Sequence, residues 1–432
     1  MKKCNYVSIT EAISHVKSND KIVLGHGAVS PILLLEELYR QRERLFGVKI
    51  FHLIYLGDPV HTRLDAQAHF QTRAPFITGG AIRDAVAENR AEFVPMHFHI
   101  IPYHFLPGGG YEPDWAFIQV TPPDANGLCS LSLASDYTLP AARAAKRVIA
   151  MVNPNLPYVY GDNFLSVDEI DFMVEAPMEN LTIASSPITE TDQKIAEYCT
   201  SLIGDGACIQ VGIGSVPEAV LSKLHDRKDL GIHTELMTDA IMNLIKSGAV
   251  NGSKKGVLPN KVLTAFAMGS QEMYDFMHNN DDILLYPVDF TNNPFEVGKN
   301  ENFVSINSTI EVDLYGQLCS EKVNGRQYSG TGGQVDFLRG ARYSRGGKSI
   351  ITVHSTAKNG TISRIVPSLS AGNNVTSGRT DVDYIVTEHG IAHLFGKSER
   401  ERALALCAIA DPRFREELEK EAYTRFNIKK IF

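Results

Sequence analysis

The sequence predicts an α/β protein built from two related α/β domains. Its 432 residues exceed what one ordinary hydrophobic core holds, so we expect two domains of about 200 residues. Short apolar runs alternate with stretches of helical apolar spacing, which is typical of α/β layering. A polar, turn-rich stretch at residues 184–191 indicates the boundary. We therefore expect an N-terminal domain of residues 1–187 and a C-terminal domain of residues 188–432.

The first domain opens with a helix, a strand and a glycine loop. SITE at residues 8–11 is a capping box for a helix N-terminus. KIVL at 21–24 reads as a buried strand, GHGAVSP at 25–31 as a loop, and residues 32–39 as a helix. Further strands are expected at residues 48–55, 115–120 and 147–152.

The same unit recurs in the second domain. CIQV at 208–211 is the strand, GIGSVP at 212–217 the loop, and residues 218–224 the helix. Proline near the first helical turn suits both copies, since the N–H it lacks would have no helical partner there. Additional strands are expected at residues 283–288 and 349–354, and an exposed terminal helix from residue 411.

Composition excludes several classes of protein. A net charge of −8 argues against a nucleic-acid or membrane-surface partner, because both require a basic footprint. The N-terminus has no apolar core of a signal peptide, and no run of about 18 apolar residues predicts a membrane span. The six cysteines lack C-x-x-C spacing, which favours a reducing cytoplasm over a disulfide framework or a zinc ribbon.

Glu235 is the central candidate for chemistry. It lies about 20 residues beyond the 212–217 loop, the spacing at which an acid binds ribose in a dinucleotide fold. The loop departs from that fingerprint, because Pro217 stands where the third glycine belongs. The loop itself could be a ligand loop or a packing turn. Spacing leaves Glu235 as a ribose ligand, a nucleophile or a helix cap, and leaves a nicotinamide-binding oxidoreductase as an alternative.

Histidine motifs give weaker signals. His233 and Glu235 match the H-x-E of zinc deaminases, but the P-C-x-x-C that would complete such a site is missing. His97 and His99, with His104 nearby, would share one face of a strand. We expect that face to be polar, with metal binding as the alternative, and we predict no metal site.

A second glycine loop is followed by basic residues. SGTGGQVDF at 329–337 leads into a cluster comprising Arg339, Arg342, Arg345 and Lys348, and Lys358 and Arg364 follow after one predicted strand. In an acidic protein this local positive charge suggests a ligand that carries phosphate. The alternative is a solvated basic face.

Five segments follow one another along the chain. They are DWAFIQVTPPDANGLCSL at 114–131, QVGIGSVP at 210–217, HTE at 233–235, SGTGGQVDF at 329–337 and DYIVTEHGIAHLFGKSERERA at 383–403. Together they resemble the acetyl-CoA hydrolase/transferase family of class I CoA-transferases, especially its 4-hydroxybutyrate and butyryl-CoA:acetate branch. The resemblance covers nearly the whole chain. It implies two open α/β domains with the active site at their interface.

The resemblance also implies roles for individual residues. Glu235 would be the nucleophile that carries CoA as a glutamyl-CoA thioester in a ping-pong reaction. CoA would lie against one loop formed by Gly212, Ile213, Gly214, Ser215 and Val216, against a second with Gly330, Gly332 and Gly333, and against Lys358. The substrates would be a short-chain acyl-CoA and a free carboxylate such as acetate, with no tightly bound cofactor.

Two expectations concern the class of reaction and the assembly. An acyl-CoA hydrolase would use the same fold but admit water to the intermediate, and it is the main alternative. The resemblance favours a homo-oligomer, either a dimer or a tetramer. The sequence leaves the exchanged acids open among acetate, butyrate and 4-hydroxybutyrate.

Overall fold

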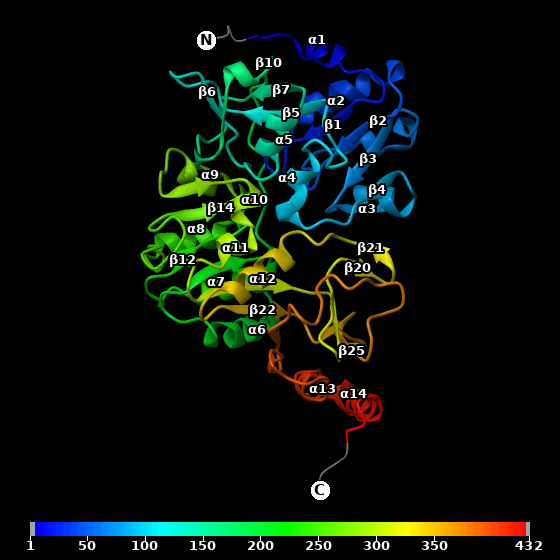
Figure 1. Ribbon diagram of the computed structural model, residues 1–432, viewed down its shortest axis with the longest axis vertical. Helices are drawn as coiled ribbons and strands as arrows, with labels where there is room; N and C mark the ends of the chain where they lie inside the picture. Colours follow the sequence, from blue (N-terminus) through cyan, green and yellow to red (C-terminus); the bar gives the residue numbers. More distant parts are fainter. Residues whose placement is uncertain (1–4, 429–432) are drawn as a thin grey trace. The chain divides into compact units, whose positions relative to one another are not determined.

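The computed structural model describes residues 5–428, which form two compact units (Figure 1). Of the described residues, unit 1 contains 5–184, Glu235–Asp239 and Lys261–Asn292. Unit 2 contains Ser185–Thr234, Ala240–Asn260 and residues 293–428. The chain therefore returns twice to unit 1 after first leaving it, and one of these returns begins at Glu235. The predicted domain boundary between residues 187 and 188 stays a prediction.

Unit 1 is built on a seven-stranded sheet in the order β10-β7-β5-β1-β2-β3-β4. All of its strand pairs are parallel, and the central strand β5 is buried along its whole length, which matches its apolar run. The strands are β1 (Lys21–Leu24), β2 (Val48–Phe51), β3 (Phe70–Ala74), β4 (Ala91–Phe93), β5 (Trp115–Val120), β7 (Arg147–Val152) and β10 (Phe172–Glu175). The predicted strands at 21–24, 115–120 and 147–152 are confirmed, and the one at 48–55 ends at Phe51.

Short helices and small sheets complete unit 1. Leu34, Leu35 and Leu38 of α2 pack with Ile22 and Leu24 of β1 in one hydrophobic cluster. The helices are α1 (Ile9–Ser14), α2 (Ile32–Arg40), α3 (Gly80–Ala87), α4 (Ile101–His104), α5 (Thr138–Ala144), α9 (Gln271–Met277) and α10 (Val288–Thr291). The small sheets pair β6 (Leu128–Ser130) with β9 (Phe164–Ser166), β13 (Leu236–Met237) with β15 (Phe266–Ala267), and β16 (Ile283–Leu285) with β14 (Val262–Thr264) and β8 (Tyr160–Gly161).

The predicted strand through His97 and His99 is wrong. A 3₁₀ turn over Phe98–Ile100 leads directly into α4, and the two imidazoles stack with their centroids 6.4 Å apart. Pro102, which lacks a backbone N–H, suits the first turn of α4 better than a central strand. Within residues 5–428, no group of three or more metal-binding side chains comes together.

Unit 2 is built on a six-stranded sheet in the order β12-β11-β17-β22-β26-β27. Only its edge strand β27 is antiparallel to its neighbour. The strands are β11 (Cys208–Val211), β12 (Gly231–Ile232), β17 (Phe303–Ser308), β22 (Lys348–Thr352), β26 (Tyr384–Thr387) and β27 (Gly390–His393). The expected strand at 208–211 is confirmed residue for residue, and the expected strand at 349–354 is β22, shifted by one or two residues at its ends.

Helices and short strand pairs surround this sheet. The helices are α6 (Glu190–Ser201), α7 (Ser215–Ser222), α8 (Asp239–Lys246), α11 (Pro294–Val297), α12 (Gln334–Tyr343), α13 (Glu399–Ala408) and α14 (Pro412–Arg425). The short strands are β18 (Glu311–Asp313), β19 (Leu318–Cys319), β20 (Lys322–Val323), β21 (Arg326–Gln327), β23 (Thr356–Ala357), β24 (Ile362–Ser363) and β25 (Ile365–Val366). The terminal helix expected from residue 411 is α14, which Asp411 caps.

The two glycine loops occupy equivalent places in their sheets. Gly25, directly after β1, donates its N–H to Phe117 O of β5 at 2.8 Å. Gly212, directly after β11, donates to Ile306 O of β17 at the same distance. In each sheet the loop follows a strand whose two neighbours come later in the chain, one on each side. The internal repeat read from the sequence is thus present in the structure.

Two further features concern membrane-spanning helices and cysteines. Among residues 5–428, no helix has the length and apolar character needed to cross a bilayer. The described cysteines are buried free thiols at positions 129, 199, 208, 319 and 407.

Candidate active site

The backbone of Glu235 is held from one side by the segment around β15. Its carbonyl oxygen accepts hydrogen bonds from Ala265 N at 3.0 Å, from Phe266 N at 3.1 Å and from the Thr264 hydroxyl at 3.0 Å. Directly after it, β13 pairs in parallel with β15. Rigid strands place side chains more accurately than loops do, so this carboxylate has a well-defined position.

Asn292 fixes the carboxylate itself. Its Nδ2 donates to Oε2 of Glu235 at 2.6 Å, and Asn292 is completely buried at the C-terminus of α10. The cap interpretation of Glu235 is weakened, because α8 begins four residues later and the carboxylate instead accepts from an amide. Sequence reasoning missed Asn292. It lies 57 residues from Glu235, and no local pattern marks it.

The loop after β11 is shaped to bring backbone close to a ligand. A Cβ added to Gly212 would lie 2.9 Å from Asn307 Oδ1, and Gly214 has φ +129°, so both positions require glycine. Ile213 between them is 54% exposed. The helix expected from residue 218 starts earlier, at Ser215, because Pro217 falls in the first turn, where its missing N–H costs nothing.

The other predicted CoA-binding segments lie at the same edge of the unit 2 sheet. Gly333 is the N-cap of α12, and Gly332 has φ +53°. Because α12 runs back toward the start of the parallel strand β22, its N-terminus lies at the carboxyl edge, where β11 ends and Gly212 begins the loop. Open α/β sheets bind ligands at this edge, at the point where strand order reverses. Gly330 directly precedes this turn and is buried.

Lys358 follows β22 and is exposed in the tight connection between β23 and β24. Its φ is +47° and that of Asn359 is +56°. A left-handed backbone at a lysine is uncommon, and such strain concentrates at functional sites. Lys358 therefore lies in the turn of the β23–β24 hairpin, and the pairing of these two strands fixes the backbone of that turn.

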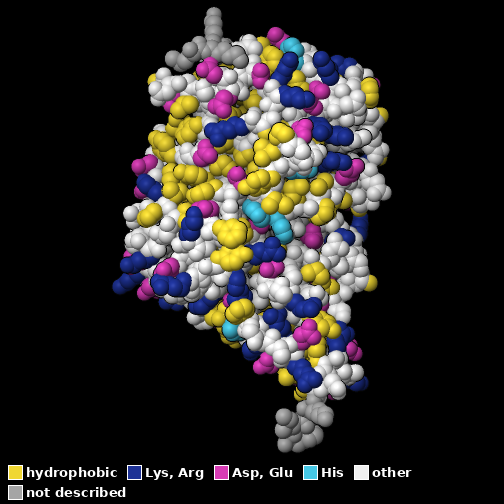
Figure 2. All heavy atoms as spheres, viewed as in Figure 1, with side chains coloured by type: hydrophobic (Ala, Val, Ile, Leu, Met, Phe, Trp, Pro, Cys, Tyr) yellow, Lys and Arg dark blue, Asp and Glu magenta, His cyan; other side chains and the backbone are white. Residues whose placement is uncertain are grey.

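The predicted cationic cluster is largely paired within the protein. Arg339 forms an ion pair with Asp381 at 3.2 Å, and Arg345 forms one with Glu301 at 2.6 Å. Lys348 donates to a backbone carbonyl at 2.7 Å, and the Arg342 guanidinium lies 3.5 Å from the centre of the Phe395 ring. Figure 2 shows Lys and Arg side chains interspersed with Asp and Glu on the face in view. This result favours the solvated-face alternative for the cluster and leaves Lys358 as the candidate cation.

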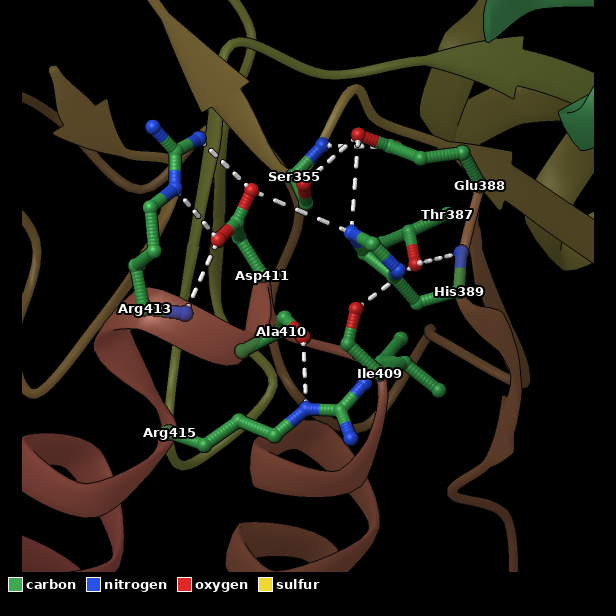
Figure 3. Close-up of polar contacts among 9 residues, drawn as sticks. All are labelled: Ser355, Thr387, Glu388, His389, Ile409, Ala410, Asp411, Arg413 and Arg415. Carbon is green, nitrogen blue, oxygen red and sulfur yellow. Dashed lines mark hydrogen bonds and ion pairs between the residues drawn. The ribbon is translucent and has the colours of Figure 1, made fainter. Parts of the chain in front are cut away.

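A second carboxylate braces the segment that leads to Lys358 (Figure 3). Glu388, in the turn between β26 and β27, accepts from Ser355 N at 2.9 Å and from the Ser355 hydroxyl at 2.6 Å. His389 Nε2 lies 3.9 Å from Glu388 and 4.0 Å from Asp411, whose pKa the Arg413 side chain lowers to about 2. The motif at 383–403 contains Glu388, but the sequence alone assigned it no role.

The chain matches two domain families over most of its length. Residues 2–184 match the acetyl-CoA hydrolase/transferase N-terminal domain, and residues 269–422 match the C-terminal domain.

Curated relatives match almost end to end. The 4-hydroxybutyrate coenzyme A transferase of Clostridium kluyveri is 45% identical over 97% of both chains. The succinyl-CoA:cyclohexane-1-carboxylate CoA transferase of Geobacter metallireducens is 44% identical over 97% of this chain and 95% of its own. An acetyl-CoA hydrolase of Kluyveromyces lactis is more distant, at 27% identity over 77% of this chain and 71% of its own.

A solved structure agrees with this assignment. The crystal structure of 4-hydroxybutyrate CoA-transferase from Porphyromonas gingivalis superposes with a TM-score of 0.85, at 41% identity and 98% coverage of both chains. The protein is therefore an enzyme of the acetyl-CoA hydrolase/transferase family, on the branch whose members are CoA-transferases.

Proposed function

We propose that the protein transfers CoA from a short-chain acyl-CoA to a free carboxylic acid, with Glu235 as the covalent carrier. This proposal rests on the position of the Glu235 side chain. Its carboxylate accepts a 2.6 Å hydrogen bond from Asn292, and its backbone carbonyl accepts hydrogen bonds from the segment around β15. A carboxylate is already ionised at neutral pH, so it can attack without a general base. Covalent transfer also conserves the thioester, which direct hydrolysis would destroy.

The proposed reaction has four nucleophilic attacks. The Glu235 carboxylate attacks the thioester carbonyl and expels CoA thiolate, which leaves a mixed anhydride. The thiolate then attacks the glutamyl carbonyl, releasing the first acid as its carboxylate and forming glutamyl-CoA. The acceptor carboxylate attacks this new thioester and expels the thiolate again. Attack of the thiolate on the acyl carbonyl releases the new acyl-CoA and regenerates Glu235.

Each attack places negative charge on a carbonyl oxygen. Among residues 211–216, the N–H groups of Val211 and Gly212 already donate to Thr234 and Ile306. The remaining backbone N–H groups of this loop and that of Gly332 are our candidates for stabilising the charge, because glycine backbone permits close approach. CoA would bind along Gly212, Ile213, Gly214, Ser215 and Val216, along Gly330, Gly332 and Gly333, and at Lys358. Binding energy from the remote part of CoA would offset the cost of forming the anhydride. Coenzyme A is then substrate and covalent intermediate, and no tightly bound cofactor takes part.

Borohydride trapping tests the nucleophile directly. Incubation with acyl-CoA followed by borohydride should reduce the glutamyl thioester to an alcohol, and peptide mapping should find the change at Glu235. A label on a different residue would refute the assignment. Glu235→Ala should abolish transfer while the protein still folds, with a lower Tm because the buried Asn292 amide loses its acceptor.

Product analysis separates the transferase from the hydrolase. With acetyl-CoA as donor, a transferase releases little free CoA and forms a new acyl-CoA only when an acceptor acid is present. CoA release at the same rate without any acceptor would identify a hydrolase. We further propose that the enzyme is cytoplasmic and that it acts as a homo-oligomer. Light scattering of the purified protein would test the oligomeric state.

A further inference from the structure

The turn that carries Lys358 is backed by an arginine of the helix α14, which has no part in the function proposed so far. A Cβ added to Gly360 would lie 2.6 Å from Arg413 Nη2, 2.8 Å from Nη1 and 3.1 Å from Cζ. The two terminal nitrogens are nearest and Cζ is farther away, so the guanidinium points its Nη1–Nη2 edge at the Gly360 backbone. Gly360 lies two residues from Lys358, in the same turn between β23 and β24.

Asp411 holds the guanidinium of Arg413 along a second edge (Figure 3). Nε donates to Asp411 Oδ1 at 2.9 Å, and Nη2 donates to Oδ2 at 2.8 Å. The same carboxylate accepts from Arg413 N at 2.9 Å and caps α14. A bidentate pair fixes the plane of a guanidinium as well as its position, so the edge that faces Gly360 is fixed too.

The helix that carries Arg413 is itself anchored in unit 2. Leu418 and Ala422 of α14 are buried, and they belong to one hydrophobic cluster with Ile365 of β25. β25 starts directly after the hairpin, one residue beyond the end of β24. The arginine and the strand that leaves the hairpin therefore share one core, which makes α14 a rigid support.

The turn itself is short and strained. β23 and β24 pair over two residues each. Three consecutive residues then follow β23 with left-handed backbone, since φ is +47° at Lys358, +56° at Asn359 and +81° at Gly360. Residues other than glycine keep such a conformation only where the surrounding structure holds it. Glu388 braces the chain before the hairpin, and Arg413 contacts the far end of the turn.

We propose that Arg413 is a positioning residue for CoA: from α14 it holds the β23–β24 turn in the conformation that presents Lys358 to the phosphates of the ligand. The proposal rests on the CoA-transferase function given above, in which Lys358 contacts CoA. The ion pair with Asp411 suits this role, because its two charges offset one another and support the turn without opposing the charge of Lys358. Without the guanidinium the turn would sample other conformations, and Lys358 would contribute less to binding.

The first experiment compares the two substrates of Arg413→Ala, with butyryl-CoA as donor and acetate as acceptor. Lys358 helps to recruit acyl-CoA from solution, whereas the acceptor meets an enzyme that already carries CoA covalently. Arg413→Ala should therefore lower kcat/KM for butyryl-CoA by about tenfold and leave kcat/KM for acetate within about twofold. Two unchanged values, or an equal fall in both, would overturn the proposal. If the unmodified protein transfers CoA from no acyl-CoA to any acid, the proposed function itself fails.

Two further variants separate the shape of the guanidinium from its charge. Arg413→Lys keeps the charge, but one ammonium group cannot bond both Asp411 oxygens and face Gly360 at once. It should behave like Arg413→Ala, and recovery of kcat/KM for butyryl-CoA would overturn the positioning role. Arg415 is the matched control, because it lies in the same helix and donates to Ala410 O at 2.8 Å (Figure 3). Arg415→Ala should leave both kcat/KM values within about twofold, and a loss like that of Arg413→Ala would overturn the proposal.

A double-mutant cycle then connects Arg413 to Lys358. Lys358→Ala should itself lower kcat/KM for butyryl-CoA, because it removes the proposed cation. In that background Arg413→Ala should cost less than about a further twofold, since residues that act through one contact are not additive. Independent losses, or no loss in Lys358→Ala, would overturn the proposal. Thermal unfolding checks that each variant folds, which we expect because Asp411 caps α14 through a backbone N–H that the substitutions at position 413 keep.

Discussion

Removal of the Asn292 amide tests whether the geometry around Glu235 governs the reaction. The 2.6 Å bond from Nδ2 to Oε2 joins a neutral amide to a carboxylate, and Asn292 is completely buried. Hydrogen bonds to charged groups contribute about 1.5–3 kcal/mol, and each 1.36 kcal/mol corresponds to a factor of ten in rate. Asn292→Ala should therefore lower kcat/KM by about 10- to 150-fold.

The assay is the steady-state formation of new acyl-CoA, combined with the yield of glutamyl-CoA trapped by borohydride. Both should fall together, because the amide orients the carboxylate before the first attack. Asn293→Ala is a matched control. The neighbouring Asn293 caps α11 through a 3.0 Å bond to Phe295 N, so its loss should lower Tm and leave kcat/KM unchanged.

The result that refutes the reasoning is equally specific. If Asn292→Ala folds and retains kcat/KM within twofold, the hydrogen bond does not position the nucleophile. An equal loss of activity in Asn292→Ala and Asn293→Ala would mean that the activity falls because the fold is destabilised, and not because the Glu235 carboxylate loses its hydrogen bond. The comparison works because the two asparagines are adjacent in sequence but bond to different partners.

Three other outcomes follow from the structure. Burial lowers the pKa of His52 to about 4 and that of His61 well below its usual range, so the folded protein holds both imidazoles neutral. Their contribution to stability is present above pH 6.5 and is lost as the pH falls toward 4, so the free energy of urea unfolding should be lower at pH 4 than at pH 7.5. Glu388→Gln weakens the brace on Ser355, so KM for acyl-CoA should rise several-fold with kcat little changed, and an unchanged KM would argue against the role. Gly212→Ala places a Cβ 2.9 Å from a side-chain oxygen in the β11 loop, so CoA affinity measured by calorimetry should fall at least tenfold.

The central strands were predictable because burial on both faces of a parallel sheet demands continuous apolar runs. KIVL at 21–24, WAFIQV at 115–120 and CIQV at 208–211 are such runs, and each is a strand with the expected bounds. The stretch around His97 was not predictable by alternation, because Phe98 and Ile101 are buried at the three-residue spacing of a helical turn. Local sequence patterns thus predicted secondary structure correctly where the spacing of apolar residues was unambiguous.

The candidate site was predictable only in part, for a reason that lies in its construction. Glycine loops and Glu235 carry local signals, since a tight backbone or an acid at a fixed spacing is visible in the sequence. Asn292 acts through a partner 57 residues away, and no local pattern records such a distance. The cationic cluster shows the converse: the sequence records the arginines but not the carboxylates that pair with Arg339 and Arg345, and the phosphate site stays a prediction.

The two glycine loops show how one repeated unit can diverge through its side chains. Each loop follows the strand at which its sheet reverses order, and each glycine donates to the same kind of neighbour at 2.8 Å, so the backbone alone does not distinguish them. The side chains distinguish them. After β11 the loop presents exposed Ile213 and the N-terminus of α7, which suits a long ligand bound through backbone N–H groups. After β1 the loop presents His26, which is 1% exposed and lies 2.5 Å from the buried carboxylate of Asp136, so this copy packs into its own unit and the β11 copy is the better candidate for a ligand loop.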